Sequence, residues 1–310
     1  MIKIAIVGTN GLAQLLAHYI ETTTSHQFVI FSRRPVSGLT NKGWQVVVVN
    51  YSSTTDLSFK LAGVDTVVST VSGDAQLRLI EAAATARVRR FVPAEFGGPP
   101  ALRSADDILD NERRRALHRL AQLESTGMRF CVFTCGIFYE RFAPGGLGQS
   151  QLGASSGVAT EGSYMVDFRR LVARLPYNSS DGSPAKVSMI SLRDLAHFVV
   201  ASFALTSWPR EFRVRGDRMS VRDLVATAES IRGSRSFDVQ RYSRSALRDA
   251  EAHARTARDK PRELQLHQLI ITAEGHYDFA QSTDNNLNSR VNLEPERFRA
   301  YLTRAWSNTH

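Results

Sequence analysis

Short apolar runs rich in β-branched residues alternate with helical stretches over the first 135 residues, and this alternation constrains the fold more than any other feature. The pattern predicts strands at 2–7, 28–31, 44–50, 66–69, 90–93 and 130–134, and helices at 11–21, 75–86 and 107–124. Strands separated by helices need crossover connections, which place the strands in a parallel sheet covered on both faces. The sequence therefore predicts an α/β fold built on a doubly wound parallel sheet.

The pattern loosens after residue 142. Residues 143–157 are rich in Gly and Ser and are expected to form a long loop over a site. Further on we expect strands at 187–191 and 211–214, and helices at 194–205, from Ser220, over the charged stretch 241–267 and at 294–306. These elements predict a main domain at 1–150 and a smaller α+β part at 151–310, with about 186–215 returning to the main core.

Composition and charge narrow the classes of function. Apolar residues make up 43% of the chain, enough for a full core, so disorder is excluded as the main state. The net charge is +9, but the arginines are scattered among acidic residues and no nucleic-acid-binding motif is present. Affinity for small anionic molecules explains this charge as well as nucleic acid does, and we expect no nucleic-acid partner.

The sequence also bears on location. Its longest apolar runs are far shorter than the roughly 18 to 20 residues of a membrane-spanning helix, so we expect no membrane partner. The chain opens directly into a strand without a leader pattern, and Cys131 and Cys135 are too close along one strand to pair. We therefore expect a cytoplasmic protein, either a monomer or a homodimer.

The first strand runs into a turn with two glycines that is typical of phosphate binding. Gly8 allows the tight turn out of the strand, and Gly11 allows the backbone to approach a pyrophosphate at the start of the following helix. The full motif has a third glycine where this chain has Gln14. The position of the turn between an N-terminal strand and a helix favours a dinucleotide-binding Rossmann fold.

The end of the second strand indicates which dinucleotide binds. It reads Ser32-Arg33-Arg34, where an NAD-specific fold usually carries an acidic residue for the ribose 2′-hydroxyl. Two guanidinium groups instead suit a 2′-phosphate through charge-assisted hydrogen bonds, although they are also compatible with an ordinary solvated surface. This feature favours NADPH (or NADP⁺) as the cofactor.

Four longer stretches carry a family resemblance. They are QLRLIEAAATARVRRFVPAEFG (76–97), FTCGIFYERFAPGGL (133–147), VSMISLRDLAHFVVASF (187–203) and GHYDFAQSTDNN (275–286). Together they resemble the NmrA-like and isoflavone reductase-like group, atypical members of the short-chain dehydrogenase/reductase superfamily, and fungal proteins of that group in particular. The resemblance extends over essentially the whole chain.

The resemblance implies a set of cofactor contacts. The phosphate turn would contribute Gly8, Thr9, Asn10, Gly11, Leu12 and Ala13, and Ser32, Arg33 and Arg34 would hold the 2′-phosphate. Thr70 and Val71 would border the adenosine and diphosphate. The nicotinamide would be bordered by Pro93, Ala94, Glu95, Gly136, Ile137 and Phe138.

One departure from the family concerns its lysine. Reductases of the group carry a lysine on the helix after the Glu-Phe-Gly turn, and the hydrophobic register puts Arg114 there, to within one residue. No lysine occurs anywhere between residues 61 and 185, so the Tyr-x-x-x-Lys pair of ordinary short-chain dehydrogenases is absent as well. Ala94 replaces the usual serine of the turn. A guanidinium is a poor proton donor but can stabilise an oxyanion.

Three other residues are candidates for acid–base chemistry. Tyr139 follows the last strand of the main domain, Tyr164 could reach the cleft from the smaller part, and His118 lies one helical turn after Arg114. Each has a simpler interpretation, since such tyrosines commonly pack in a core and such a histidine commonly lies on the surface. Glu95 is expected to orient its turn or to pair with an arginine. No cluster has the spacing of metal ligands.

The leading hypothesis is an NADPH-dependent oxidoreductase that acts on a small aromatic or unsaturated secondary metabolite. Two alternatives stay open. One is a redox-neutral biosynthetic enzyme on the same fold. The other is an NADP(H)-sensing, NmrA-like regulator without turnover, which the missing lysine favours.

Overall fold

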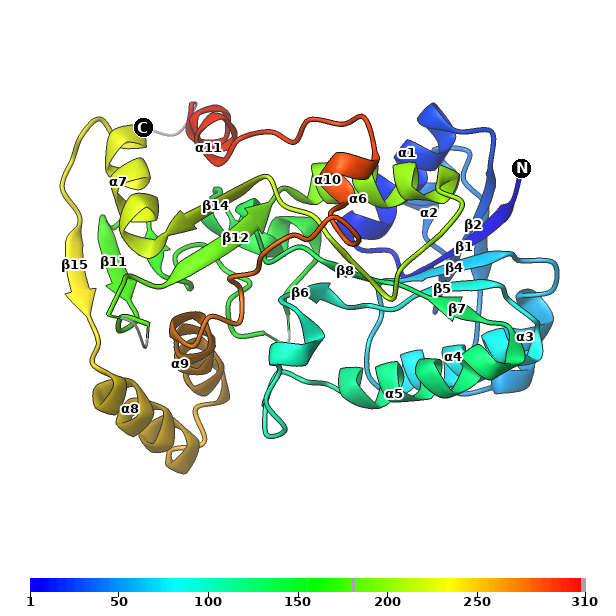
Figure 1. The fold of residues 1–310 in the computed structure, drawn as a ribbon, viewed down its shortest axis with the longest axis horizontal. Coiled ribbons are helices and arrows are strands. Elements are labelled where there is room, and N and C mark those ends of the chain that lie inside the picture. The colour runs from blue at the N-terminus through cyan, green and yellow to red at the C-terminus, as the bar shows by residue number, and fades with distance from the viewer. Residues whose placement is uncertain (155, 180–181, 308–310) are drawn as a thin grey trace.

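A computed structural model of the chain describes residues 1–154, 156–179 and 182–307. Its main sheet has six strands with all pairings parallel, and Figure 1 shows it on the right. In spatial order these are β3(Val46–Val48), β2(Gln27–Ser32), β1(Lys3–Val7), β4(Thr66–Ser69), β5(Arg90–Val92) and β7(Arg129–Phe130). The strand order reverses direction between β1 and β4, so the predicted doubly wound α/β fold is confirmed. Ligands of such sheets bind beyond the carboxyl ends of the strands at this point.

Helices cover both faces of this sheet, as strict alternation along β1 requires. Ile4 and Ile6 pack with α1(Gly11–Thr23) and α6(Leu192–Ala201), which lie side by side above the sheet in Figure 1. Ala5 and Val7 point the other way. They pack in the layer formed by α3(Thr54–Lys60), α4(Asp74–Thr85) and α5(Arg113–Leu123).

Two three-stranded sheets continue from the main sheet. In the first, β8(Val132–Thr134) lies between β6(Phe96–Gly97) and β13(Glu211–Arg213). In the second, β12(Lys186–Ile190) lies between β9(Ile137–Phe138) and β14(Asp217–Ser220). The chain thus crosses from the smaller part back to the main domain through β12, α6 and β13.

The smaller part has a core of its own. A third small sheet contains β10(Val166–Asp167), β11(Val172–Leu175) and β15(Asp238–Arg241). Around it lie α7(Val221–Ile231), α8(Arg244–Thr256), α9(Lys260–Ala273) and α11(Phe298–Trp306), on the left of Figure 1. Large aromatic side chains fill the space between these elements, among them Phe142, Phe168, Phe298 and Trp306.

The remaining elements are short. They are α2(Ser37–Thr40), α10(Leu287–Arg290), η1(Pro100–Leu102), η2(Glu124–Thr126), η3(Tyr139–Phe142), η4(Gly146–Ser150) and η5(Ser202–Ala204). The expected loop 143–157, of which residue 155 lies outside the described residues, contains η4.

Two expected helices differ from the structure. The one expected at 107–124 begins at Arg113, because Asn111 and Glu112 adopt positive φ values of 44° and 64° that no α-helix contains. The one expected at 241–267 is two helices: Arg258, at φ 56°, reverses the chain after α8, and Asp259 caps the start of α9. The strand expected at 130–134 is likewise divided into β7 and β8, which join different sheets.

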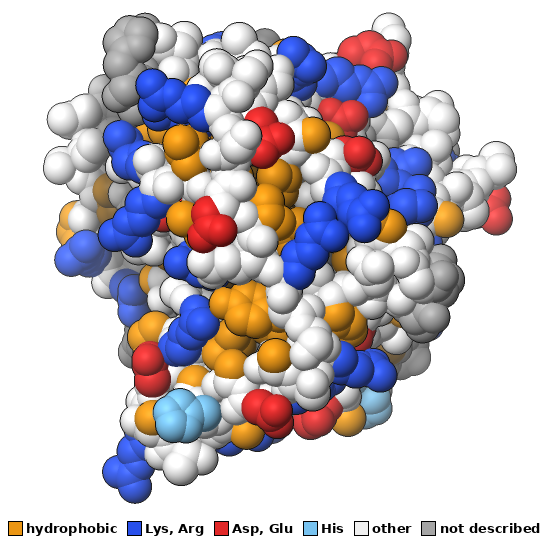
Figure 2. Space-filling model, turned by 90° about the vertical axis from the view of Figure 1, so that its left-hand side faces the viewer, with side chains coloured by type: hydrophobic (Ala, Val, Ile, Leu, Met, Phe, Trp, Pro, Cys, Tyr) orange, Lys and Arg blue, Asp and Glu red, His pale blue; other side chains and the backbone are white. Residues whose placement is uncertain are grey.

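The surface carries its positive charge in a dispersed form. Figure 2 views the molecule from the left-hand side of Figure 1, where arginine and lysine side chains are interspersed with acidic and apolar ones over the visible face. In the described part of the chain, no helix combines the length and the apolar character needed to cross a membrane.

Candidate active site

The phosphate turn is held by its own hydrogen bonds. Gly8 has a φ of +112°, and a Cβ atom built there would lie 2.2 Å from Oγ1 of Thr70, so a side chain at this position is excluded. Asn10 caps α1, since its Oδ1 accepts from the backbone N–H of Ala13 at 3.0 Å. Its Nδ2 donates to the Thr70 carbonyl at 3.4 Å, which ties the turn to the end of β4.

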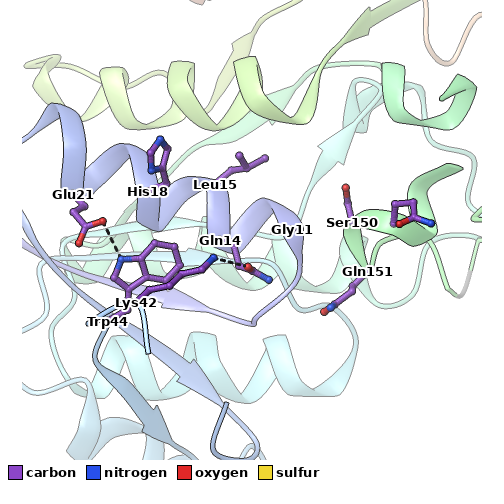
Figure 3. Close-up of a pocket in the computed structure, with 10 residues that line it drawn as sticks. Gly11, Gln14, Leu15, His18, Glu21, Lys42, Trp44, Ser150 and Gln151 are labelled. Atoms are coloured by element: carbon purple, nitrogen blue, oxygen red, sulfur yellow. Dashed lines mark hydrogen bonds between the residues drawn. The ribbon is translucent and has the colours of Figure 1, made fainter. Parts of the chain in front are cut away.

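Gln14, which replaces the third glycine of the motif, supports the turn from outside. Its Nε2 donates to the carbonyl of Thr9 at 3.1 Å, and its Oε1 accepts from Lys42 at 3.4 Å. Figure 3 shows these side chains along the outer face of α1, in a separate cavity of about 600 Å³ that also contains Trp44. Gln14 therefore leaves the phosphate-binding end of α1 clear.

Gly11 serves a contact within the chain. A Cβ atom there would lie 2.8 Å from Cβ of Ser150 and 2.9 Å from its carbonyl oxygen. The 3-10 helix η4 thus packs directly against the start of α1. The Gly- and Ser-rich segment that was expected to cover a site is anchored at the phosphate turn.

The end of β2 presents two free cations. Arg33 and Arg34 are exposed, and neither forms an ion pair within the described part of the chain. Ser32 is buried, and its Oγ accepts from the Arg34 N–H at 3.3 Å. Burial raises the pKa of Tyr51, and the nearby positive charge of Arg33 opposes this rise. This arrangement fits a 2′-phosphate.

A cavity of about 810 Å³ opens beyond the carboxyl ends of the strands. Of the expected cofactor residues it is lined by Asn10, Leu12, Thr70, Ala94, Glu95, Gly136 and Phe138. The opposite wall comes mainly from the smaller part and includes Gly153, Leu264, Gln268, Ile271, His276 and Tyr277. The cavity thus lies between the phosphate turn and α9, and both parts of the chain contribute to it.

The other expected cofactor residues do not line this cavity. Ala13 and Ile137 are buried in the cores, and Val71 packs beside Gly8, within 3.2 Å of the position of its missing Cβ. Pro93 lies in the buried turn after β5. A cofactor can contact these residues only through the backbone or at the edge of the turn.

The two candidate tyrosines lie in the core of the smaller part. Tyr139 packs on Phe298 and Tyr301, and its hydroxyl donates to the Glu296 carbonyl at 3.2 Å. Tyr164 is buried, with its hydroxyl 2.6 Å from Oγ1 of Thr272. Burial raises the pKa of both phenols. Neither side chain lines the cavity, so the structure supports the simpler interpretation that they pack the core.

The two candidates on α5 are exposed. His118 is at the surface, and Arg114 donates from its guanidinium to the Ser104 carbonyl. Arg113, one residue earlier, lines the cavity instead. One step along a helix turns a side chain by about 100°, so Arg113 and Arg114 point in different directions, and Arg113 lies within the one-residue range of the predicted position.

Sequence reasoning also missed Arg141, Arg103 and His276, which all line the cavity. Arg141 lies in η3, and its guanidinium carbon is 4.8 Å from the centre of the Tyr164 ring. Only its place in the FYERF stretch next to the predicted nicotinamide segment could have suggested it. His276 packs against Gly98, and burial lowers the pKa of its ring.

A buried charge network supports the cavity wall. Glu95 pairs with Arg103, as expected of an orienting residue, and Arg103 lies 3.8 Å from Asp107. Oδ1 of Asp107 accepts from Nε2 of His267 at 3.0 Å, and Oε1 of Glu251 accepts from Nδ1 of the same ring at 2.8 Å. Burial opposes the charge on Arg103, but Glu95 and the neighbouring aspartates outweigh it and raise the pKa of the guanidinium. This network links the Glu95 turn to α8 and α9.

Fold and site together define a Rossmann-type α/β protein with one large cavity between the phosphate turn and a smaller part. No protein-family model matches the chain. The chain is 26% identical over 273 residues to oxidoreductase BOA1 of Botryotinia fuckeliana (strain B05.10). The matched region covers 82% of this chain and 83% of that protein.

Solved structures of low sequence identity share the fold. AtPrR2 with NADP⁺ and (+)pinoresinol has a TM-score of 0.76 at 18% identity, over 98% of both chains. The ternary complex of leucoanthocyanidin reductase from Vitis vinifera has a TM-score of 0.71 at 17% identity, over 97% of this chain and 98% of that one. At these identities the structures show that the chain shares their fold, as the family resemblance led us to expect.

Proposed function

We propose that this protein is an NADPH-dependent reductase of a small aromatic or unsaturated secondary metabolite. The observation that carries the proposal is the shared cavity. Asn10, Leu12 and Thr70 line it at the phosphate turn, and Leu264 and Ile271 line it from α9. A dinucleotide whose phosphates bind at the turn would place its nicotinamide in the same cavity as an apolar substrate.

The described residues fit this cofactor. Gly8 forms the tight turn at a φ of +112° that no side chain could share, and the first N–H groups of α1 face an anion favourably. Arg33 and Arg34 are the two cations for the 2′-phosphate. When bound, NADPH supplies a hydride. The names and bound molecules of the similar proteins, oxidoreductase BOA1 and AtPrR2 with NADP⁺ and (+)pinoresinol, support this assignment.

Arg113 and Arg141 take the electrostatic role that sequence reasoning gave to Arg114. Both line the cavity, and a guanidinium stabilises negative charge on a substrate oxygen without giving up a proton. Reduction of a double bond conjugated to a carbonyl develops such charge on the carbonyl oxygen, and water can supply the proton. The cavity therefore suits the reduction of a conjugated double bond better than it suits a reduction in which a lysine must donate the proton.

The test has two stages. Fluorescence titration should show NADPH binding, and the protein should then oxidise NADPH in the presence of at least one member of a panel of conjugated aromatic ketones. Arg113→Met should reduce kcat/KM by about 5- to 150-fold, the effect of about 1 to 3 kcal/mol expected for a lost charged donor. Arg115→Met, an exposed neighbour on the same helix, should leave it unchanged. Absence of NADPH binding would contradict the proposal.

A second candidate function is an NADP(H)-sensing regulator. It is favoured because the cavity wall offers no clear substitute for the family's lysine. Lys260 is the one lysine among the described lining residues, and it is 58% exposed and paired with Glu263. Tight NADPH binding without oxidation by any panel member would support this function. Conversion of a substrate without net NADPH consumption would instead indicate a redox-neutral enzyme.

A further inference from the structure

Two guanidinium groups in the cavity have buried nitrogens without hydrogen-bond partners. These atoms are Nε of Arg113 and both Nε and Nη1 of Arg141. Neither arginine forms an ion pair within the described part of the chain, and neither side chain donates a hydrogen bond there. A guanidinium carries five N–H donors, so each group retains several for a ligand.

The other cations of the cavity wall are neutralised. Arg103 pairs with Glu95 and lies near Asp107, while Lys260 pairs with Glu263 at 2.9 Å. A buried donor or charge without a partner destabilises the folded state, so proteins seldom retain one without a use for it. Two such groups in one cavity therefore indicate a ligand that satisfies them.

The two arginines reach the same region from different elements. Arg113 begins α5, and Arg141 lies in η3 after β9. Both line the same cavity as Tyr277, and both charges oppose the rise that burial causes in the pKa of this phenol. The Tyr277 hydroxyl donates to Oε1 of Gln268 at 3.0 Å, and no hydrogen bond joins it to either guanidinium in the described part of the chain. The Arg141 guanidinium lies over the Tyr164 ring.

We propose that the substrate carries a carboxylate, which Arg113 and Arg141 bind together. That the ligand is the substrate rests on the proposed function, but the carboxylate-binding site rests on the two arginines alone. A carboxylate offers two oxygens that match the fork of guanidinium donors. Apolar residues that line the same cavity, including Ile108, Leu109, Leu264 and Ile271, suit an aromatic or unsaturated body.

The test compares acids with their neutral amides. Isothermal titration would measure the Kd of cinnamate against cinnamamide, and of benzoate against benzamide, with and without NADP⁺. The acid of a pair should bind at least tenfold more tightly, a difference of about 1.4 kcal/mol. Arg113→Gln and Arg141→Gln should each remove most of this preference, whereas Arg115→Gln, on the exposed face of α5, should retain it.

Two further readouts separate this proposal from other outcomes. The unfolding midpoint of the ligand-free Arg141→Gln variant should not fall below that of the parent, because the variant removes an unpaired buried charge. NADPH affinity should also stay within twofold of the parent in both variants, since a loss there would assign the arginines to the cofactor phosphates and overturn the proposal. Equal binding of acid and amide in every pair, or a preference that survives both substitutions, would also overturn it. Failure of NADPH to bind the parent would refute the proposed function alone.

Discussion

Substitution of Arg103 by methionine should strongly destabilise the protein, because Arg103 joins the carboxylates behind the cavity wall. Its side chain is 4% exposed, and those of Glu95 and Asp107 are 2% and 5% exposed. Methionine retains much of the volume but leaves these acids without their shared cation. Glu95 is affected most, since its Oε2 already has no hydrogen-bond partner.

The magnitude follows from the burial of the pair. Removal of one partner of a buried ion pair costs about 3 to 5 kcal/mol, because the remaining charge stays desolvated. The pair Arg89–Asp65 provides a matched control at 3.3 Å with Arg89 77% exposed. Arg89→Met should cost less than about 1 kcal/mol, as exposed pairs do. The Glu95→Gln change should recover part of the loss in an Arg103→Met background.

Equilibrium urea unfolding at two pH values would measure both variants. The destabilisation by Arg103→Met should be smaller at pH near 5 than at pH near 8, because protonation of the stranded carboxylates removes the unpaired charge. A loss for Arg103→Met within about 1 kcal/mol of that for Arg89→Met would refute the reasoning. A loss that does not change with pH would show that packing, and not charge, is responsible.

Three further predictions concern the cofactor turn and the histidine of the network. The parent should bind NADPH at least tenfold more tightly than NADH, about 1.4 kcal/mol, and Arg33→Ala with Arg34→Ala should abolish this preference in fluorescence titrations. Gly8→Ala should weaken NADPH binding and lower stability by clearly more than Gly63→Ala, since Gly63 shares a positive φ but has nothing within 4 Å of its Cβ position. Burial alone would lower the pKa of His267, but hydrogen bonds to its two carboxylate partners outweigh burial and raise it. Protonated His267 therefore stabilises the fold below its ordinary pKa of about 6.5. The difference in the free energy of unfolding between the parent and His267→Gln should shrink as the pH rises through the raised pKa. A difference that stays constant from about pH 6 to 9 would contradict this.

The main sheet and the phosphate turn were predictable because their signals are local. The residues of β1 are buried on both faces, so the strand appears as one continuous apolar run, and the turn follows it directly. The position of Arg33 and Arg34 was predictable for the same reason, since it depends only on where β2 ends. The contact of Gly8 with Thr70, by contrast, joins residues far apart along the chain and was not predictable.

The cavity residues were less predictable because they depend on distant contacts. The partners of Tyr139 and Tyr164 are 157 and 108 residues away along the chain, so nothing near either tyrosine shows that it is buried. His267 meets Asp107 across 160 residues. The one-residue shift from Arg114 to Arg113 has another origin. Turn residues before α5 set where the helix begins, and hydrophobic periodicity does not detect their backbone conformation.

The arginines also bear on the lysine that the family resemblance led us to expect. A lysine can hold a proton or release it, whereas a guanidinium remains charged through the neutral range and acts only by its field and its hydrogen bonds. Exchange of one for the other therefore changes what the cavity can do. Arg113 and Arg141 can bind an anion and stabilise developing charge, but the proton of a reduction must come from elsewhere, such as solvent. If this is correct, Arg113→Lys should keep the preference for a carboxylate, and a solvent isotope effect on turnover that appears or disappears in this variant would show that the source of the proton has changed.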